Sequence, residues 1–129
     1  MLEALRAAGI RTGVVTNKVE HLALRLTDNL GLDGQLDVVL GSDSEGCAMK
    51  PAPDSLLTAA RLTGVPVTDI LYAGDDPRDV AAAHAAGMPC AACTWGYAVT
   101  PPESWGADLV AHSPAELATW AVQLNAHAL

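Results

Sequence analysis

The sequence has 129 residues, half of them hydrophobic, and a formal net charge of −8, which suits one folded domain over residues 1–129. Its seven Lys and Arg residues are too few for the basic surfaces that bind nucleic acid or anionic membranes, so neither partner is expected. The apolar runs are too short to span a membrane, no signal-peptide pattern is present, and three cysteines make no disulfide framework, so we expect a reducing cytoplasm.

Helix-like and strand-like patterns alternate along the chain. The first half predicts a helix over 2–8, a strand over 13–16, a helix over 19–30, a strand over 36–40, a polar loop over 42–50 and a helix over about 53–63. The second half predicts a strand over 69–73, a helix over 77–86, a strand over 89–93, a loop over 95–106, an edge strand over 107–111 and a helix over 114–127.

This alternation predicts a doubly wound, Rossmann-like α/β fold, with a parallel sheet and helices on both of its faces. In the helix at 19–30, the residues Val19, Leu22, Leu26 and Leu30 fall on one face. Functional sites of such folds lie beyond the carboxyl ends of the strands. A candidate motif should therefore come directly after a predicted strand.

Three polar clusters meet this criterion. Residues 16–18 (TNK) end the first strand, Lys50 lies in the loop after the second, and residues 75–79 (DDPRD) follow the third. A phosphoryl group could use all of them, because its oxygens accept hydrogen bonds from Thr16 and nearby amides while Lys50 offsets its charge. Carboxylates at 75–79 are the hard oxygen ligands that Mg²⁺ takes. Each residue also has a plain alternative, with Thr16 an ordinary strand residue and Lys50 a solvated lysine.

The acidic cluster has its own structural alternative. Asp76 directly precedes Pro77 and is well placed as the N-cap of the helix at 77–86, with Pro77 at its first position. Asp79 then falls at the third helical position, where it can complete a capping box. Asp75 serves no local backbone need of this kind, so the structural alternative does not account for it.

Together the segments VVTNK, KPAPDSL and YAGDDPRDVAAAHAAGMP resemble the haloacid dehalogenase-like hydrolases, and within them the phosphoglycolate phosphatase branch. The resemblance covers nearly all 129 residues, but only the second part of a full family member. It implies that Thr16 and the amide of Asn17 bind the phosphoryl group and that Lys50 neutralises its charge. It also implies Mg²⁺ as cofactor, with Asp75 as a direct ligand and Asp79 as an outer-shell or second ligand.

The sequence departs from the family in one important way. Members of the family open with a strand ending in D-x-D-G-T, whose first Asp is phosphorylated, and this sequence contains no D-x-D. The small helical cap of the branch has no counterpart either. We therefore expect the chain to be the C-terminal part of a phosphatase whose aspartyl-phosphate forms on a residue outside it, and to show no turnover alone.

The same departure bears on the sheet. In the family, the first strand lies between the strands predicted here at 13–16 and 69–73. Without it, buried backbone groups of both neighbours lose their partners. Either the two strands close up, or another chain fills the gap by self-association, or the domain is poorly stable.

The substrate expected from the branch is a small phosphorylated metabolite, 2-phosphoglycolate first and a sugar phosphate second. The alternative function is a non-catalytic module that binds phosphate or Mg²⁺ or completes a partner chain. Other phosphate-binding classes fit less well, because the sequence has no P-loop or dinucleotide motif and a phospho-receiver domain has its acidic pair first along the chain.

The remaining chemistry-bearing residues receive structural interpretations. Cys90 and Cys93 match C-x-x-C but fall on a predicted buried strand, so we interpret them as small core residues. Cys47 is interpreted as a loop cysteine, and Tyr97 could line the mouth of the site. The histidines lack metal-ligand spacing, and the tryptophans are expected to pack.

Overall fold

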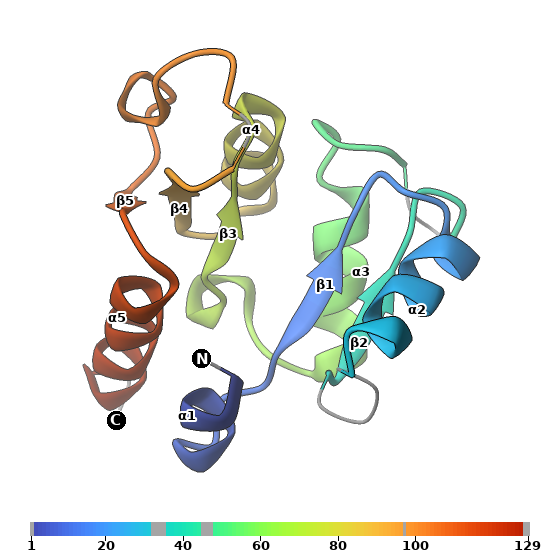
Figure 1. The fold of residues 1–129 in the computed structure, drawn as a ribbon, viewed down its shortest axis with the longest axis horizontal. Coiled ribbons are helices and arrows are strands. Elements are labelled where there is room, and N and C mark those ends of the chain that lie inside the picture. The colour runs from blue at the N-terminus through green and yellow to red at the C-terminus, as the bar shows by residue number, and fades with distance from the viewer. Residues whose placement is uncertain (1, 32–35, 45–47, 97, 128–129) are drawn as a thin grey trace.

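The structure, a computed structural model, describes residues 2–31, 36–44, 48–96 and 98–127. In these parts of the chain the strands are β1 (Gly13–Val15), β2 (Val38–Leu40), β3 (Tyr72–Gly74), β4 (Cys90–Cys93) and β5 (Leu109–Ala111). The α-helices are α1 (Leu2–Ala7), α2 (Glu20–Asn29), α3 (Asp54–Thr63), α4 (Pro77–Ala86) and α5 (Pro114–His127). Two short 3₁₀ helices, η1 (Val67–Asp69) and η2 (Pro102–Ser104), complete the fold (Figure 1).

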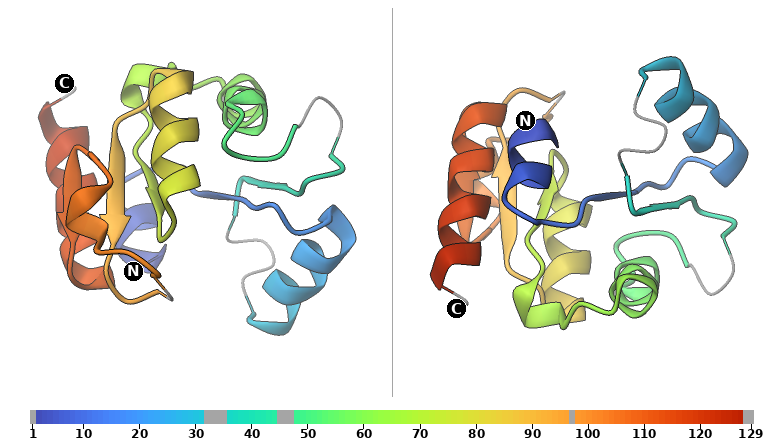
Figure 2. Two further views of the ribbon diagram at one scale, coloured as in Figure 1. Left: turned by 90° about the horizontal axis from the view of Figure 1, so that it is seen from above. Right: turned by 90° about the horizontal axis from the view of Figure 1, so that it is seen from below.

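All of the described strand pairs are parallel. β1 pairs with β2, while β3, β4 and β5 form a second sheet in that order, which leaves β5 at the predicted edge. Figure 2 shows α2 and α3 on opposite sides of the first sheet and α4 and α5 on opposite sides of the second. This is the α/β arrangement that the alternation predicts, in incomplete form.

The sheet is interrupted between β1 and β3, where the family resemblance places a further strand. Among the described strands, β1 pairs only with β2, and β3 pairs only with β4 and not with β1. A side chain links them instead, because the Tyr72 hydroxyl donates a 2.9 Å hydrogen bond to the Val15 carbonyl. The two strands have therefore not closed up, which was the first of the three outcomes considered.

The third strand begins later than predicted. Residues 69–73 were expected to form it, but β3 spans Tyr72–Gly74. The segment before it forms η1. There the Asp69 amide donates a 2.9 Å hydrogen bond to the Pro66 carbonyl, and the Ile70 amide donates a 3.2 Å bond to the Val67 carbonyl. These local bonds take backbone groups that a longer strand would need.

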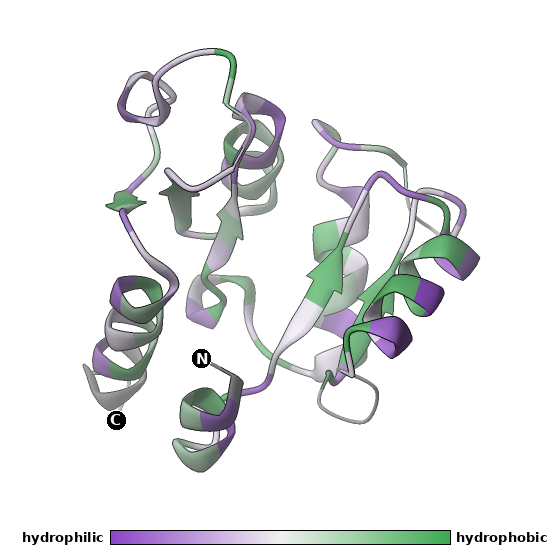
Figure 3. Cartoon of the chain, in the orientation of Figure 1, coloured by the Kyte–Doolittle hydropathy of each residue, from purple (hydrophilic) through white to green (hydrophobic). Residues whose placement is uncertain are grey.

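Helix α2 forms where its periodicity predicts, but its leucine face is not the buried one. Leu22, Leu26 and Leu30 are 43%, 48% and 64% exposed, whereas Ala23 and Thr27 are buried. The small side chains on that face allow the helix to lie close to β2. Figure 3 accordingly shows hydrophobic residues on α2 as well as on the strands.

Two core clusters lie on the two faces of the second sheet. One joins α3 and α4 through Leu56, Val80 and Cys90, and the other joins β4 and β5 to α5 through Cys93 and Leu117. Burial raises the pKa of Cys90 to about 12 and that of Cys93 to about 11, so both thiols stay protonated. Their position agrees with the interpretation as small core residues rather than a redox pair. In the described parts of the chain, no helix combines the length and apolarity needed to cross a membrane.

The start of α4 matches its sequence signals. The Asp76 side chain accepts a 2.9 Å hydrogen bond from the Arg78 amide, Pro77 occupies the first turn, and the Asp79 side chain accepts a 3.2 Å bond from the Asp76 amide. This is the capping box predicted for the segment. At the other end, Gly87 adopts φ +82°. Glycine takes this left-handed conformation after a helix without the steric cost that a Cβ atom would add.

We expect Asp76→Ala to lower the free energy of unfolding by about 1 kcal/mol, because an N-cap oxygen is lost. Asp76→Ser retains a capping oxygen and should lose much less. Hydrogen bonds from Arg78 lower the pKa of Asp76, so the ionised carboxylate stabilises the folded state. The stability difference between the wild type and Asp76→Ala should therefore be largest at neutral pH and shrink as the pH falls below the usual pKa of 3.8. Urea unfolding at several pH values measures this, and equal losses in both variants would contradict it.

Candidate active site

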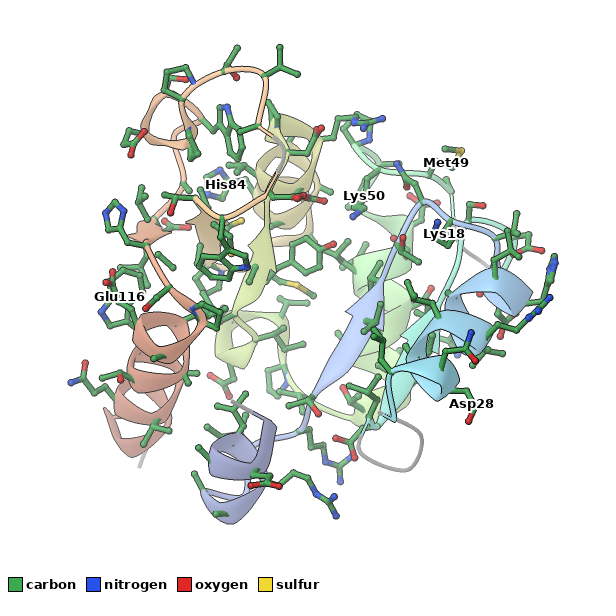
Figure 4. The ribbon with its side chains drawn as sticks, in the orientation of Figure 1. Lys18, Asp28, Met49, Lys50, His84 and Glu116 are labelled. Atoms are coloured by element: carbon green, nitrogen blue, oxygen red, sulfur yellow. The ribbon has the colours of Figure 1, made fainter. Side chains whose placement is uncertain are left out.

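Lys50 is the centre of the polar cluster at the carboxyl ends of β1 and β3. Its ammonium lies 2.5 Å from Asp79 Oδ1, 2.8 Å from the Tyr72 hydroxyl and 3.3 Å from the Val15 carbonyl oxygen. The side chains of Lys50 and Asp79 are only 10% and 8% exposed, so this is a nearly buried ion pair. Figure 4 shows Lys50 pointing into the space between β1 and β3.

Asn17 fixes the segment that carries Lys50. Its side-chain oxygen accepts from the Lys50 amide at 2.9 Å, and its side-chain nitrogen donates to the Lys50 carbonyl at 3.3 Å. The pair of bonds ties the second residue after β1 to the loop before α3, 33 positions later. The phosphate-binding role that the sequence predicts for Asn17 belongs to its backbone amide, which these two side-chain bonds do not use.

Thr16 continues the β1 ladder by one residue, since its amide donates to the Leu40 carbonyl at 3.0 Å. Its hydroxyl oxygen accepts from the Lys18 amide at 3.2 Å. Acting as an acceptor there, the hydroxyl keeps its own O–H group for another acceptor. Thr16, Asn17 and Lys50 therefore meet at one edge of the fold.

The three carboxylates of the acidic cluster have different partners. Asp79 is buried and uses both oxygens, one for Lys50 and the other for the amides of Asp75 and Asp76 at 3.1 and 3.2 Å. Asp76 caps α4 and also accepts from the Arg78 guanidinium at 3.0 Å. The Asp75 carboxylate is exposed, and no hydrogen bond to it is found among the described residues.

This donor set fits a magnesium ion held through Asp75. Mg²⁺ commonly takes one or two carboxylates and completes its shell with waters and substrate oxygens, so a single free carboxylate at the site is compatible with it. Asp79 would have to release Lys50 or two amides to act as a direct ligand. In the described regions no three His, Cys, Asp or Glu side chains gather as a metal cluster.

Tyr72 belongs to the site and was not identified from the sequence. Its hydroxyl donates to the Val15 carbonyl and accepts from Lys50. Burial, and after it the negative charge of Asp79, raises the pKa of Tyr72 above its usual value, so the phenol keeps the proton it donates. The only signal in the sequence was a polar tip on a buried strand, which generally requires a partner.

Other candidate residues lie apart from this cluster. Cys47 and Tyr97 fall outside the described residues. His84 contacts Asp108 at 3.0 Å, and Asp108 also accepts from the Cys90 amide at 2.8 Å. That contact joins α4 to the segment before β5 and involves none of the site residues.

The chain is similar to known hydrolases in sequence and in structure. A model of the haloacid dehalogenase-like hydrolase family matches residues 1–87. The chain is 44% identical over 119 residues to a phosphoglycolate phosphatase of Xanthomonas campestris pv. campestris, covering 91% of this chain and 53% of that protein. It is 36% identical over 120 residues to an N-acetylmuramic acid 6-phosphate phosphatase of Pseudomonas aeruginosa, covering 91% and 52%.

A solved structure from Lactobacillus delbrueckii subsp. bulgaricus superposes with a TM-score of 0.84 at 29% identity, covering 93% of this chain and 50% of that one. The chain thus spans about half the length of the curated relatives it matches. The likeness extends through both sheets, since it covers nearly all of the chain.

We expect Lys50→Met to lower the free energy of unfolding by about 3 kcal/mol, because it leaves the Asp79 carboxylate buried without its cation. Lys18→Met, at an exposed lysine on the same edge of the fold, is the matched control and should change stability by less than about 0.5 kcal/mol. Urea unfolding at pH 7 measures both variants. Similar values for the two would show that the ion pair does not hold the site together.

Proposed function

Because the chain belongs to the haloacid dehalogenase-like hydrolases, we propose that it carries the phosphate- and magnesium-binding part of a phosphomonoester phosphatase. The observation that carries this proposal is the position of Lys50, whose ammonium is held by Asp79 and Tyr72 beside Thr16 and Asn17. A cation fixed in this way is set to meet an anionic group without reorganisation.

Each residue has a distinct role in the proposal. The Thr16 hydroxyl and the Asn17 amide donate hydrogen bonds to phosphoryl oxygens, and Lys50 offsets their charge. Asp75 holds Mg²⁺, which when bound would neutralise charge on the ester and orient it. Asp79 supports both sides of the site, since it fixes the Lys50 ammonium and the backbone amide of Asp75.

The attacking carboxylate has no counterpart among these residues. Phosphoryl transfer through an aspartyl-phosphate needs a nucleophilic aspartate, and the sequence has no D-x-D motif. We therefore assign the nucleophile to a segment outside this chain. The difference in length between the chain and its curated relatives supports this assignment.

The names of the relatives favour 2-phosphoglycolate as the substrate, with a sugar phosphate as the second candidate. The Xanthomonas campestris relative is named a phosphoglycolate phosphatase, and the Pseudomonas aeruginosa relative is named for a phosphorylated sugar acid. We also propose a cytoplasmic location, with which the free thiols of Cys90 and Cys93 are compatible.

The test compares the chain alone with a completed protein. We expect the pure chain to show no Mg²⁺-dependent hydrolysis of p-nitrophenyl phosphate. Co-expression with the part of the Xanthomonas campestris relative outside the 119 matched residues should produce hydrolysis of 2-phosphoglycolate. Asp75→Asn should then abolish the Mg²⁺-dependent hydrolysis, whereas the control Asp69→Asn, on η1, should retain it. Rapid turnover by the chain alone would refute the division of the site.

The break in the sheet favours a second function, that of a module completed by an extended segment of another polypeptide. The Thr16 amide bonds to β2 and the Tyr72 amide bonds to the Pro89 carbonyl on the β4 side. Since successive residues of a strand point to opposite edges, Val15 and Ala73 direct their backbone groups into the gap. A parallel strand could pair with the Val15 and Ala73 amides at once, while the Val15 carbonyl accepts from Tyr72 and Lys50.

Amide hydrogen exchange tests this function. Adding the part of the Xanthomonas campestris relative outside the 119 matched residues should protect the amides of Val15 and Ala73 from exchange, because each amide gains a backbone acceptor. The Val14 amide lies on the β2 side and serves as the internal control. Sedimentation of the chain alone tests the alternative, a second copy in the gap. A monomer without new protection at Val15 and Ala73 would contradict both forms of the proposal.

A further inference from the structure

Two glycines lie directly against the two carboxylates that the site uses most. A Cβ placed on Gly74 would overlap the side chain of Asp79, and a Cβ placed on Gly96 would overlap the side chain of Asp75. Neither glycine is among those with positive φ in the described chain, so an ordinary residue could adopt either backbone conformation. The glycines are needed at these positions for space and not for backbone freedom.

A Cβ atom at position 96 would collide with more than the carboxylate of Asp75. The overlap would include the Asp75 Cβ as well as its carboxylate, and rotation about the Cα–Cβ bond does not move a Cβ atom. Relief would therefore require a backbone shift at the end of β3 or in the loop after β4. Both are held, since Gly74 pairs with Ala92 and the Thr94 amide donates to the Ala111 carbonyl at 3.0 Å.

Asp75 is exposed and lies at a hollow in the surface. Asp75 and Gly96 line a hollow of about 290 Å³, whose walls also include Trp95 and Leu117. The backbone of the loop after β4 thus covers one side of an exposed carboxylate that has no hydrogen-bond donor among the described residues. A group that restrains a carboxylate without taking its lone pairs leaves those lone pairs for a cation.

We infer that Gly96 is a positioning residue for magnesium, which keeps the Asp75 carboxylate at the carboxyl end of β3. This rests on the proposed function, in which Asp75 holds the ion. Outer groups that orient a metal ligand commonly change metal affinity by about 10- to 100-fold. Gly96 acts by contact with Asp75, and it is not expected to touch the substrate.

The test is a magnesium titration of the 129-residue chain and its variants, followed by carboxyl ¹³C and amide NMR shifts. Gly96→Ala should weaken Mg²⁺ binding at Asp75 by about tenfold or more while the circular dichroism spectrum stays that of the wild type. Val99→Ala, a position in the same loop that is 99% exposed, is the control and should bind as the wild type does.

Gly74→Ala gives a different signature. It should displace Asp79 and disturb the Lys50 ammonium signal, whereas Gly96→Ala should leave that signal in place. If Gly96→Ala does not fold, the wild-type titration still decides: Mg²⁺ should shift the Gly96 amide together with the Asp75 carboxyl and leave Gly106 unchanged. A shifted Asp75 with an unmoved Gly96 would overturn the inference.

The two levels of the proposal fail separately. If the wild type binds Mg²⁺ at Asp75 and Gly96→Ala binds it equally well, the inference on Gly96 is wrong and the proposed function stands. If Mg²⁺ produces no shift at Asp75 in the wild type, the metal site and the inference on Gly96 are both overturned.

Discussion

The ion pair between Lys50 and Asp79 is the interaction on which the arrangement of this protein depends. It joins the loop before α3 to the first turn of α4, and Tyr72 extends the same network to the Val15 carbonyl on β1. These contacts cross the break between the two sheets, where backbone pairing is absent among the described strands. Burying the two charges is costly, and their attraction together with the further hydrogen bonds of each group offsets that cost. The site and the connection between the sheets are therefore the same set of atoms.

The crowding of three carboxylates within five positions has a simple resolution. Asp79 is neutralised by Lys50 and by two backbone amides, and Asp76 is bound to the Arg78 amide and guanidinium. Each of these carboxylates thereby supports the backbone at the start of α4. Asp75 alone of the three has no hydrogen-bond donor among the described residues, and Gly96 lies against one side of it. Structural and chemical roles thus coexist in one short segment because each acid has different neighbours.

Most of the fold could be predicted because its signals are local. Periodicity located each helix and each strand, and Asp76, Pro77 and Gly87 marked the ends of α4. The rule that sites lie at the carboxyl ends of parallel strands selected Thr16, Lys50 and Asp75 before any contact was known. Two features had no such local signal. The late start of β3 depends on a competing turn before it, and the exposure of the α2 leucines depends on which face of the helix meets β2.

The sequence by itself determined the order of the elements, the capping of α4 and the chemistry available at the strand ends, because these follow from residues only a few positions apart. The tertiary structure alone decided that the Asn17 side chain locks the Lys50 backbone, that Tyr72 bridges the break, and that Gly96 bounds Asp75. Each of these contacts joins residues 21 to 57 positions apart. No periodicity or local propensity encodes such distances, so only the packing of the chain brings the partners together.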